Sequence, residues 1–171
     1  MSIKDDFTDE EWMEVMNAPL NAGGLVLSMS PSGPMGLVHE IRAMFQAMHD
    51  LTKANATSPL MQAIAEYIAH KPSKEDEAEL QALSKQQQQE FKGLKPEEAK
   101  QKMMDNLREA VALVSSKCSP EDVQAYKELI FGVAEKVAVA AKEGGFMGIG
   151  GVVVSDTEKT LLDEIRAGLE I

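Results

Sequence analysis

The chain has 171 residues, one cysteine and a formal net charge of −11, from 17 basic and 28 acidic side chains. This charge argues against nucleic acid as a partner, because non-specific binding needs Lys and Arg side chains that neutralise phosphates. The length predicts one domain over residues 1–171, the lone Cys118 favours a reducing, cytoplasmic location, and the longest weakly polar run is too short to span a bilayer.

The first helix is predicted to begin at a capping box. Thr8 and Glu11 have the spacing of such a box, in which each side chain accepts a hydrogen bond from the other residue's backbone N–H. Pro19 falls inside this helix and predicts a kink or a break near residues 17–19, because an interior proline costs about 3 kcal/mol. Gly23 and Gly24 each cost about 1 kcal/mol relative to Ala. We therefore expect another helix to approach closely across these glycines.

Helix signals recur along the rest of the chain. Serine–proline pairs, capping boxes and apolar stripes predict six more helices after the turn at Ser30–Pro34. Their expected ranges are from about Leu37 to about Lys53, from Pro59 to before Pro72, from about Lys74 to Lys92, from Pro96 through Val114, from Pro120 to about Lys142 and from Ser155 through Leu169. The first of these is expected to bury Leu37, Ile41, Met44, Phe45, Met48 and Leu51. The helix over 74–92 has few apolar positions and is expected to be peripheral. The predicted fold class is all-α, a bundle of six or seven helices.

An apolar stripe in the first helix recurs 114 positions later. The first copy is Trp12, Val15, Met16, Pro19, Leu20, Gly23, Gly24 and Leu27, and the second is Tyr126, Leu129, Ile130, Val133, Ala134, Val137, Ala138 and Ala141. This spacing places each copy on one helix face. The repeat predicts two related helix–loop–helix halves that pack on each other with their loops in equivalent places. A shared helical period without a shared origin is the alternative.

The second predicted loop is rich in glycine and holds three large apolar residues. It is a tentative ligand or partner loop that comprises Gly144, Gly145, Phe146, Met147, Gly148, Ile149, Gly150 and Gly151. Glycines let a backbone approach an anion closely, but the dinucleotide and P-loop patterns are absent. The alternative is a plain helix connection whose apolar residues enter the core.

Metal binding is the second kind of site that the sequence allows. The tentative ligands lie close to the two predicted loops and are Glu143, Asp156, Glu158 and His39. The alternative is that the acids cap a helix start and that His39 lies on a solvated face. Glu66 and His70 have no second copy, so a di-iron centre is not expected. No cofactor is predicted apart from this candidate divalent metal.

No arrangement typical of an enzyme is found. Cys118 lies beside Lys117 at a predicted helix end, which favours a modestly stabilised thiolate. No general base can be paired with it, so an inert or weakly redox-sensitive thiol is the better interpretation. The serine-hydrolase elbow is also absent. We therefore expect a protein that is not an enzyme.

The second repeat copy, Tyr126 to Ala141, is followed by Lys142-Glu143-Gly144-Gly145 and then by Val154-Ser155-Asp156-Thr157-Glu158. On these residues, the arrangement of two helix–loop–helix halves resembles the TerB-like family of tellurite-resistance-type bacterial proteins. The resemblance implies an all-helical fold, a bacterial stress-associated or scaffolding role and metal binding at the acidic loops. Glu143 stands where that family has Asp, and the first loop carries no acid. The last forty-odd residues also resemble the ends of bacterial proteins of unassigned function.

These observations lead to two functional hypotheses. The first is a non-catalytic protein that acts by association with a protein partner or with itself, through the Phe146–Ile149 loop and the helix over 74–92. The second is a metal- or small-anion-binding protein that uses the glycine loop and the neighbouring acids. Stabilisation of the fold by a bound metal or phosphate compound would favour the second.

Overall fold

The computed structural model describes residues 2–29, 34–70, 89, 92–143 and 155–171. The elements are η1 (Ile3–Asp6), α1 (Asp9–Met29), α2 (Pro34–Ala54), α3 (Pro59–Ala69), α5 (Pro96–Lys117), α6 (Pro120–Glu143) and α7 (Asp156–Leu169). No strand occurs in these residues, so the predicted all-α class is confirmed. The helix predicted over 74–92 lies almost wholly outside the described residues.

The helices begin where their capping signals predicted. At α1, the Thr8 backbone N–H donates to the Glu11 carboxylate at 2.7 Å and the Glu11 N–H donates to the Thr8 hydroxyl at 3.2 Å. At α7, Ser155 and Glu158 form the same reciprocal arrangement. These bonds satisfy N–H groups that have no partner within the helix itself. A capping residue therefore fixes the start of each of these helices.

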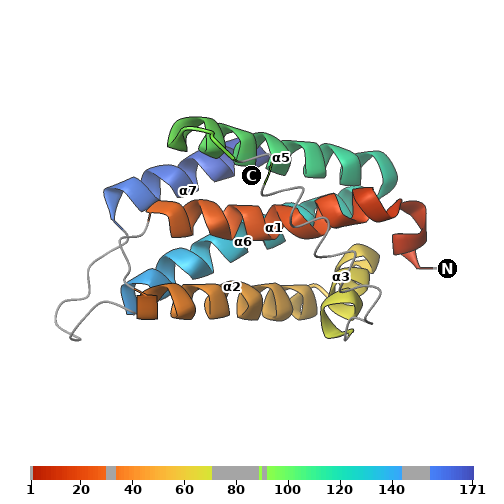
Figure 1. Ribbon diagram of the computed structural model, residues 1–171. Coiled ribbons are helices and arrows are strands. Elements are labelled where there is room, and N and C mark those ends of the chain that lie inside the picture. Colours follow the sequence, from red (N-terminus) through yellow and green to blue (C-terminus); the bar gives the residue numbers. More distant parts are fainter. Residues whose placement is uncertain (1, 30–33, 71–88, 90–91, 144–154) are drawn as a thin grey trace.

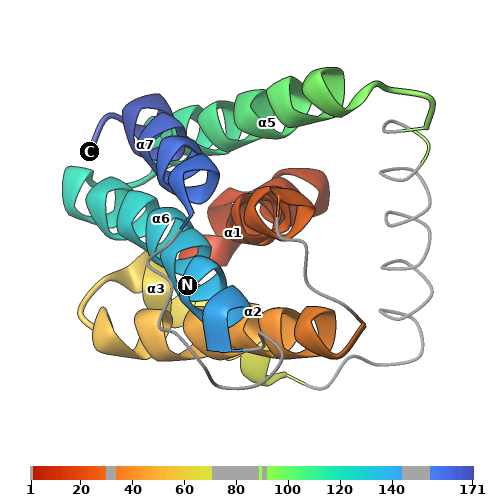
Figure 2. The same cartoon turned by 90° about the vertical axis from the view of Figure 1, so that its left-hand side faces the viewer.

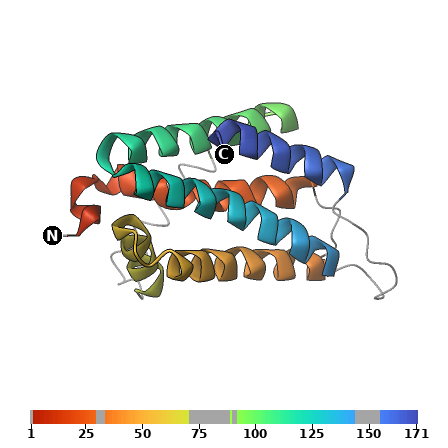
Figure 3. The same ribbon diagram turned by 180° about the vertical axis from the view of Figure 1, so that it is seen from behind.

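The described helices form three layers (Figures 1 and 2). α1 and α6 lie in the middle, α5 and α7 cover one side, and α2 with α3 covers the other. α1 and α6 run in the same direction, and α2 and α7 begin at the end of the bundle where α1 and α6 finish (Figure 3). The two helix pairs of the repeat thus turn at the same end of the molecule.

The repeated stripes form the centre of the core. Every described member of the α6 stripe, from Tyr126 to Ala138, is buried. In α1, Trp12, Val15 and Met16 are buried, whereas Leu20 is half-buried. Contact between these stripes removes most of their apolar surface from water, which is the main favourable contribution to folding.

α1 continues through Pro19 as one helix, so of the two predicted outcomes, a kink or a break, the break is wrong. Proline has no N–H to donate to the carbonyl four residues earlier, which here belongs to Val15. The hydroxyl of buried Tyr126 on α6 donates to that carbonyl at 2.6 Å. A tertiary hydrogen bond therefore replaces the missing helical one.

The predicted close approach is present at Gly23 but not at Gly24. A Cβ atom on Gly23 would lie 2.6 Å from Met44 Sδ and 3.4 Å from Val133 Cγ1, so α2 and α6 both pack against this glycine. A Cβ atom on Gly24 would meet no atom within 4 Å. Only Gly23 is thus explained by packing.

The substitution Gly24→Ala is expected to raise the free energy of unfolding by about 0.5–1 kcal/mol, because Ala restricts the unfolded chain and favours the helix. Gly23→Ala is the control and is expected to raise the free energy of unfolding by less, because the added methyl group would meet Met44. Chemical denaturation measures both values. A larger gain for Gly23→Ala than for Gly24→Ala would contradict this assignment.

The face that α2 buries differs from the predicted one. Met44 and Met48 are buried as expected, but Ile41 and Phe45 are exposed. The buried positions include Thr52, whose hydroxyl donates to the Met48 carbonyl at 2.8 Å. Because Thr52 satisfies its hydroxyl within its own helix, it can face the core at little cost. The apolar stripe that the sequence suggests is wider than the face that the fold covers.

Candidate functional site

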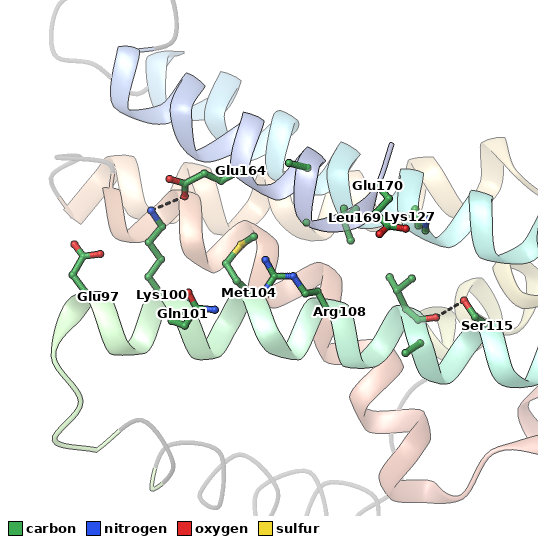
Figure 4. A pocket seen from close by; sticks show the side chains of 14 residues that line it. Glu97, Lys100, Gln101, Met104, Arg108, Ser115, Lys127, Glu164, Leu169 and Glu170 are labelled. Atoms are coloured by element: carbon green, nitrogen blue, oxygen red, sulfur yellow. Dashed lines mark hydrogen bonds and ion pairs between the residues drawn. The ribbon is translucent and has the colours of Figure 1, made fainter.

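A groove of about 790 Å³ opens between α5 and α7 (Figure 4). These two helices lie on the side of the bundle away from α2 (Figure 2). Its α5 lining is Glu97, Lys100, Gln101, Met104, Arg108, Val111, Ala112 and Ser115. Lys127 of α6 and the segment Glu164, Ala167, Gly168, Leu169 and Glu170 complete the lining. The α5 residues recur every three or four positions, so one face of α5 forms one wall.

The floor of the groove is apolar and its wall is closely packed. Met104 and Leu169 are buried beneath the groove. A Cβ atom on Gly168 would lie 3.0 Å from Met104 Cε and 3.6 Å from Arg108 Nη2. The absence of a side chain at Gly168 therefore lets Met104 and Arg108 of α5 lie against the last turn of α7.

Charged side chains of both signs line the rim. Lys100 reaches across the groove to Glu164 on α7 at 2.6 Å (Figure 4). Arg108 pairs with Asp105 at 2.8 Å. In the part of the chain that the structure describes, Lys127 forms no ion pair. Its ammonium group therefore remains available for a partner.

A second polar cluster joins the starts of α3 and α6. The buried Asp122 carboxylate accepts hydrogen bonds from the Ser58 hydroxyl at 2.5 Å, the Ser119 hydroxyl at 2.8 Å and the Leu60 N–H at 3.2 Å. Burial alone would raise the pKa of Asp122, but these hydrogen bonds outweigh it and lower the pKa. Every bond of this cluster holds a helix start, so its role is structural.

The structure describes the side chains of three predicted metal ligands, His39, Asp156 and Glu158, and they do not form a cluster. His39 is exposed on α2, and exposed Asp156 lies 3.5 Å from Lys159. The Glu158 carboxylate accepts hydrogen bonds from the Ser155 N–H and hydroxyl, as the capping alternative anticipated. Within the described residues, no three His, Cys, Asp or Glu side chains are grouped to hold a metal. The Glu143 side chain and the loop over 144–151 lie outside the described set, so the metal and loop predictions stay predictions.

The Cys118 thiol is less acidic than an ordinary cysteine. Burial, together with the nearby Asp122 and Asp6, raises its pKa to about 11, although Lys117 acts in the opposite sense. The Lys117 ammonium instead pairs with Glu11 at 2.7 Å. The raised pKa argues against the stabilised thiolate that Lys117 suggested and agrees with the inert thiol, which was the preferred interpretation of the sequence.

Native Cys118 is expected to react with iodoacetamide at neutral pH at least 100-fold more slowly than an unfolded-chain cysteine. The raised pKa leaves far less thiolate than a free cysteine, whose pKa is about 8.5. Mass spectrometry of timed samples measures the rate, and the same protein in urea is the control. Equal rates in the two conditions would show that the native thiol is not suppressed.

The groove was missed at the sequence level, although its signal is visible. Lys100, Met104, Arg108 and Val111 of α5 have the spacing of one helix face, and of these four only Met104 is buried. Sequence alone does not show that α7 borders this face without covering it. None of the described helices combines the length and apolar character that a membrane span needs. Comparisons of this chain with protein-family models, with curated proteins and with solved structures give no match.

Proposed function

We propose that this chain is a non-catalytic helical binding protein whose α5–α7 groove takes an amphipathic helix of a partner protein. The observation that carries the proposal is the length of the groove. Its α5 wall runs from Glu97 to Ser115, about 27 Å at 1.5 Å per residue. Small-molecule sites enclose most of their ligand, whereas this groove is an open face of α5 that α7 borders only over residues 164–170. Such a face fits the side of a partner helix that contacts α5 beyond the Lys100–Glu164 ion pair.

The chemistry of the groove specifies what this helix presents. The floor formed by Met104, Val111 and Leu169 calls for an apolar stripe, and methionine adapts well to different side chains. Lys127 at one end of the lining offers a charge-assisted hydrogen bond to an acidic residue of the partner. Rim charges of this kind set orientation and specificity more than affinity.

The wider biological role extends this proposal. The TerB-like resemblance favours a stress-associated or scaffolding role in a bacterial cytoplasm, where a helical protein that holds a partner would act. The metal- or small-anion-binding alternative gains no support from the described residues, because Glu158 caps α7 and Asp156 lies beside Lys159. The groove is therefore the preferred site.

The proposal predicts that a bulky residue in the groove abolishes partner capture. Ser115 lines the groove, whereas the neighbouring exposed Ser116 does not. Both hydroxyls donate to carbonyls of their own helix at 2.7 Å, so Ser115→Trp and Ser116→Trp form a matched pair. Quantitative capture from lysate of the source cell is expected to recover a specific partner at least 10-fold less with Ser115→Trp than with Ser116→Trp. The same recovery with both variants would refute the groove as the binding site.

A further inference from the structure

α2 lies on the opposite side of the bundle from α5 and α7 (Figures 1 and 3), and it carries two exposed apolar side chains. Phe45 is 53% exposed and Ile41 is 38% exposed. They are four residues apart, about 40° round the helix, and so form one patch. Adjacent exposed apolar side chains are more typical of a contact surface than scattered ones are.

The charges next to this patch are basic. Relative to Phe45, exposed His49 lies about 40° round the helix, Arg42 about 60° and Lys53 about 80°. Asp50 is the exposed acid among the described side chains of α2, and it lies about 140° away. The Asp50 carboxylate accepts hydrogen bonds from Gln46 at 3.1 and 3.2 Å and also lies 3.1 Å from His49 Nδ1, so Arg42 and Lys53 are the side chains that give this face its positive charge.

This basic patch contrasts with the net charge of −11 of the whole chain. The overall charge opposes an acidic partner at long range, but at physiological salt the Debye length is about 8 Å, so neighbouring charges dominate a docked complex. Two formal cations are too few for a nucleic acid or an anionic membrane, both of which depend on several basic side chains. Charge complementarity thus selects an acidic protein segment.

We infer that this face, formed by Ile41, Arg42, Phe45, His49 and Lys53, docks an acidic amphipathic helix of a partner protein. The apolar stripe of that helix covers Phe45 and Ile41, and its carboxylates pair with Arg42 and Lys53. The inference is independent of the α5–α7 groove and gives the molecule a second binding surface on its opposite side.

The test uses a synthetic 18-residue helical peptide with Leu along one stripe and Glu on both flanks, and a companion peptide with Lys in place of Glu. Fluorescence anisotropy measures the affinity of the full chain for each peptide at physiological salt. The Glu peptide is expected to bind more tightly than the Lys peptide. Phe45→Ser and Arg42→Glu are each expected to weaken Glu-peptide binding at least 10-fold. Leu94→Ser, which removes another exposed apolar side chain away from α2, is the control and is expected to change nothing.

Three outcomes would overturn the inference. The first is binding of the Glu peptide that neither Phe45→Ser nor Arg42→Glu weakens. The second is a preference for the Lys peptide, which would show that the overall negative charge governs docking. The third is loss of Glu-peptide binding in Ser115→Trp with retention in Phe45→Ser, which would place the peptide in the α5–α7 groove.

Discussion

Replacing Asp122 with Ala is expected to lower the free energy of unfolding by about 3 kcal/mol. The substitution removes a carboxylate that accepts bonds from Ser58, Ser119 and the Leu60 N–H, and it leaves the buried Ser58 hydroxyl without that acceptor. Loss of a helix cap costs about 1 kcal/mol, and charge-assisted hydrogen bonds contribute about 1.5–3 kcal/mol. Urea denaturation measures this decrease in the free energy of unfolding, part of which comes from the hydrogen bonds that join α3 to α6.

The pH dependence of the free energy of unfolding tests the same role of the Asp122 carboxylate. Because the folded state lowers the pKa of Asp122, its contribution is complete above the unfolded value of about 3.9 and disappears as the pH falls through the lower folded value. Asp122→Asn keeps the side-chain shape and is expected to lose less stability between about pH 5 and pH 2 than the wild type. The assigned role would be contradicted if both proteins lost the same free energy of unfolding on acidification. It would also be contradicted if Asp122→Ala lowered the free energy of unfolding by less than about 1 kcal/mol.

Replacing Tyr126 with Phe is expected to cost about 2 kcal/mol, because it leaves the Val15 carbonyl buried without a partner. The variant Pro19→Ala restores an N–H at the position that normally donates to this carbonyl. In the Pro19→Ala background, Tyr126→Phe is therefore expected to cost at least about 1 kcal/mol less. A double-mutant cycle from urea denaturation measures the coupling. Additive costs would show that the hydroxyl does not replace the bond that Pro19 removes.

Local features of the fold could be predicted from the sequence. Thr8 with Glu11 and Ser155 with Glu158 form capping boxes within four residues, so each box depends on local geometry alone. The exposed position of His39 also agrees with one of the stated alternatives. Such short-range signals locate helix starts but do not orient the helices around their axes.

Features that depend on distant partners could not be predicted. From the sequence alone, Pro19 predicts an interrupted helix. In the fold, Tyr126, more than a hundred residues later, supplies the hydrogen bond that the proline cannot make. Phe45 belongs to an apolar stripe, yet the contacts of α2 with α1 and α6 leave it exposed. The groove arises because α7 contacts α5 along only part of its length, and no single helix encodes that arrangement.

Photo-cross-linking from the groove tests the central claim most directly. A photoreactive phenylalanine analogue is placed at Ser115 in one protein and at Ser116 in another, and both are irradiated in the source cell. If a partner helix lies in the α5–α7 groove, the Ser115 probe gives a specific cross-linked protein and the Ser116 probe, one residue away, gives little or none. Equal cross-linking from both positions, or none from Ser115, would contradict the proposed function.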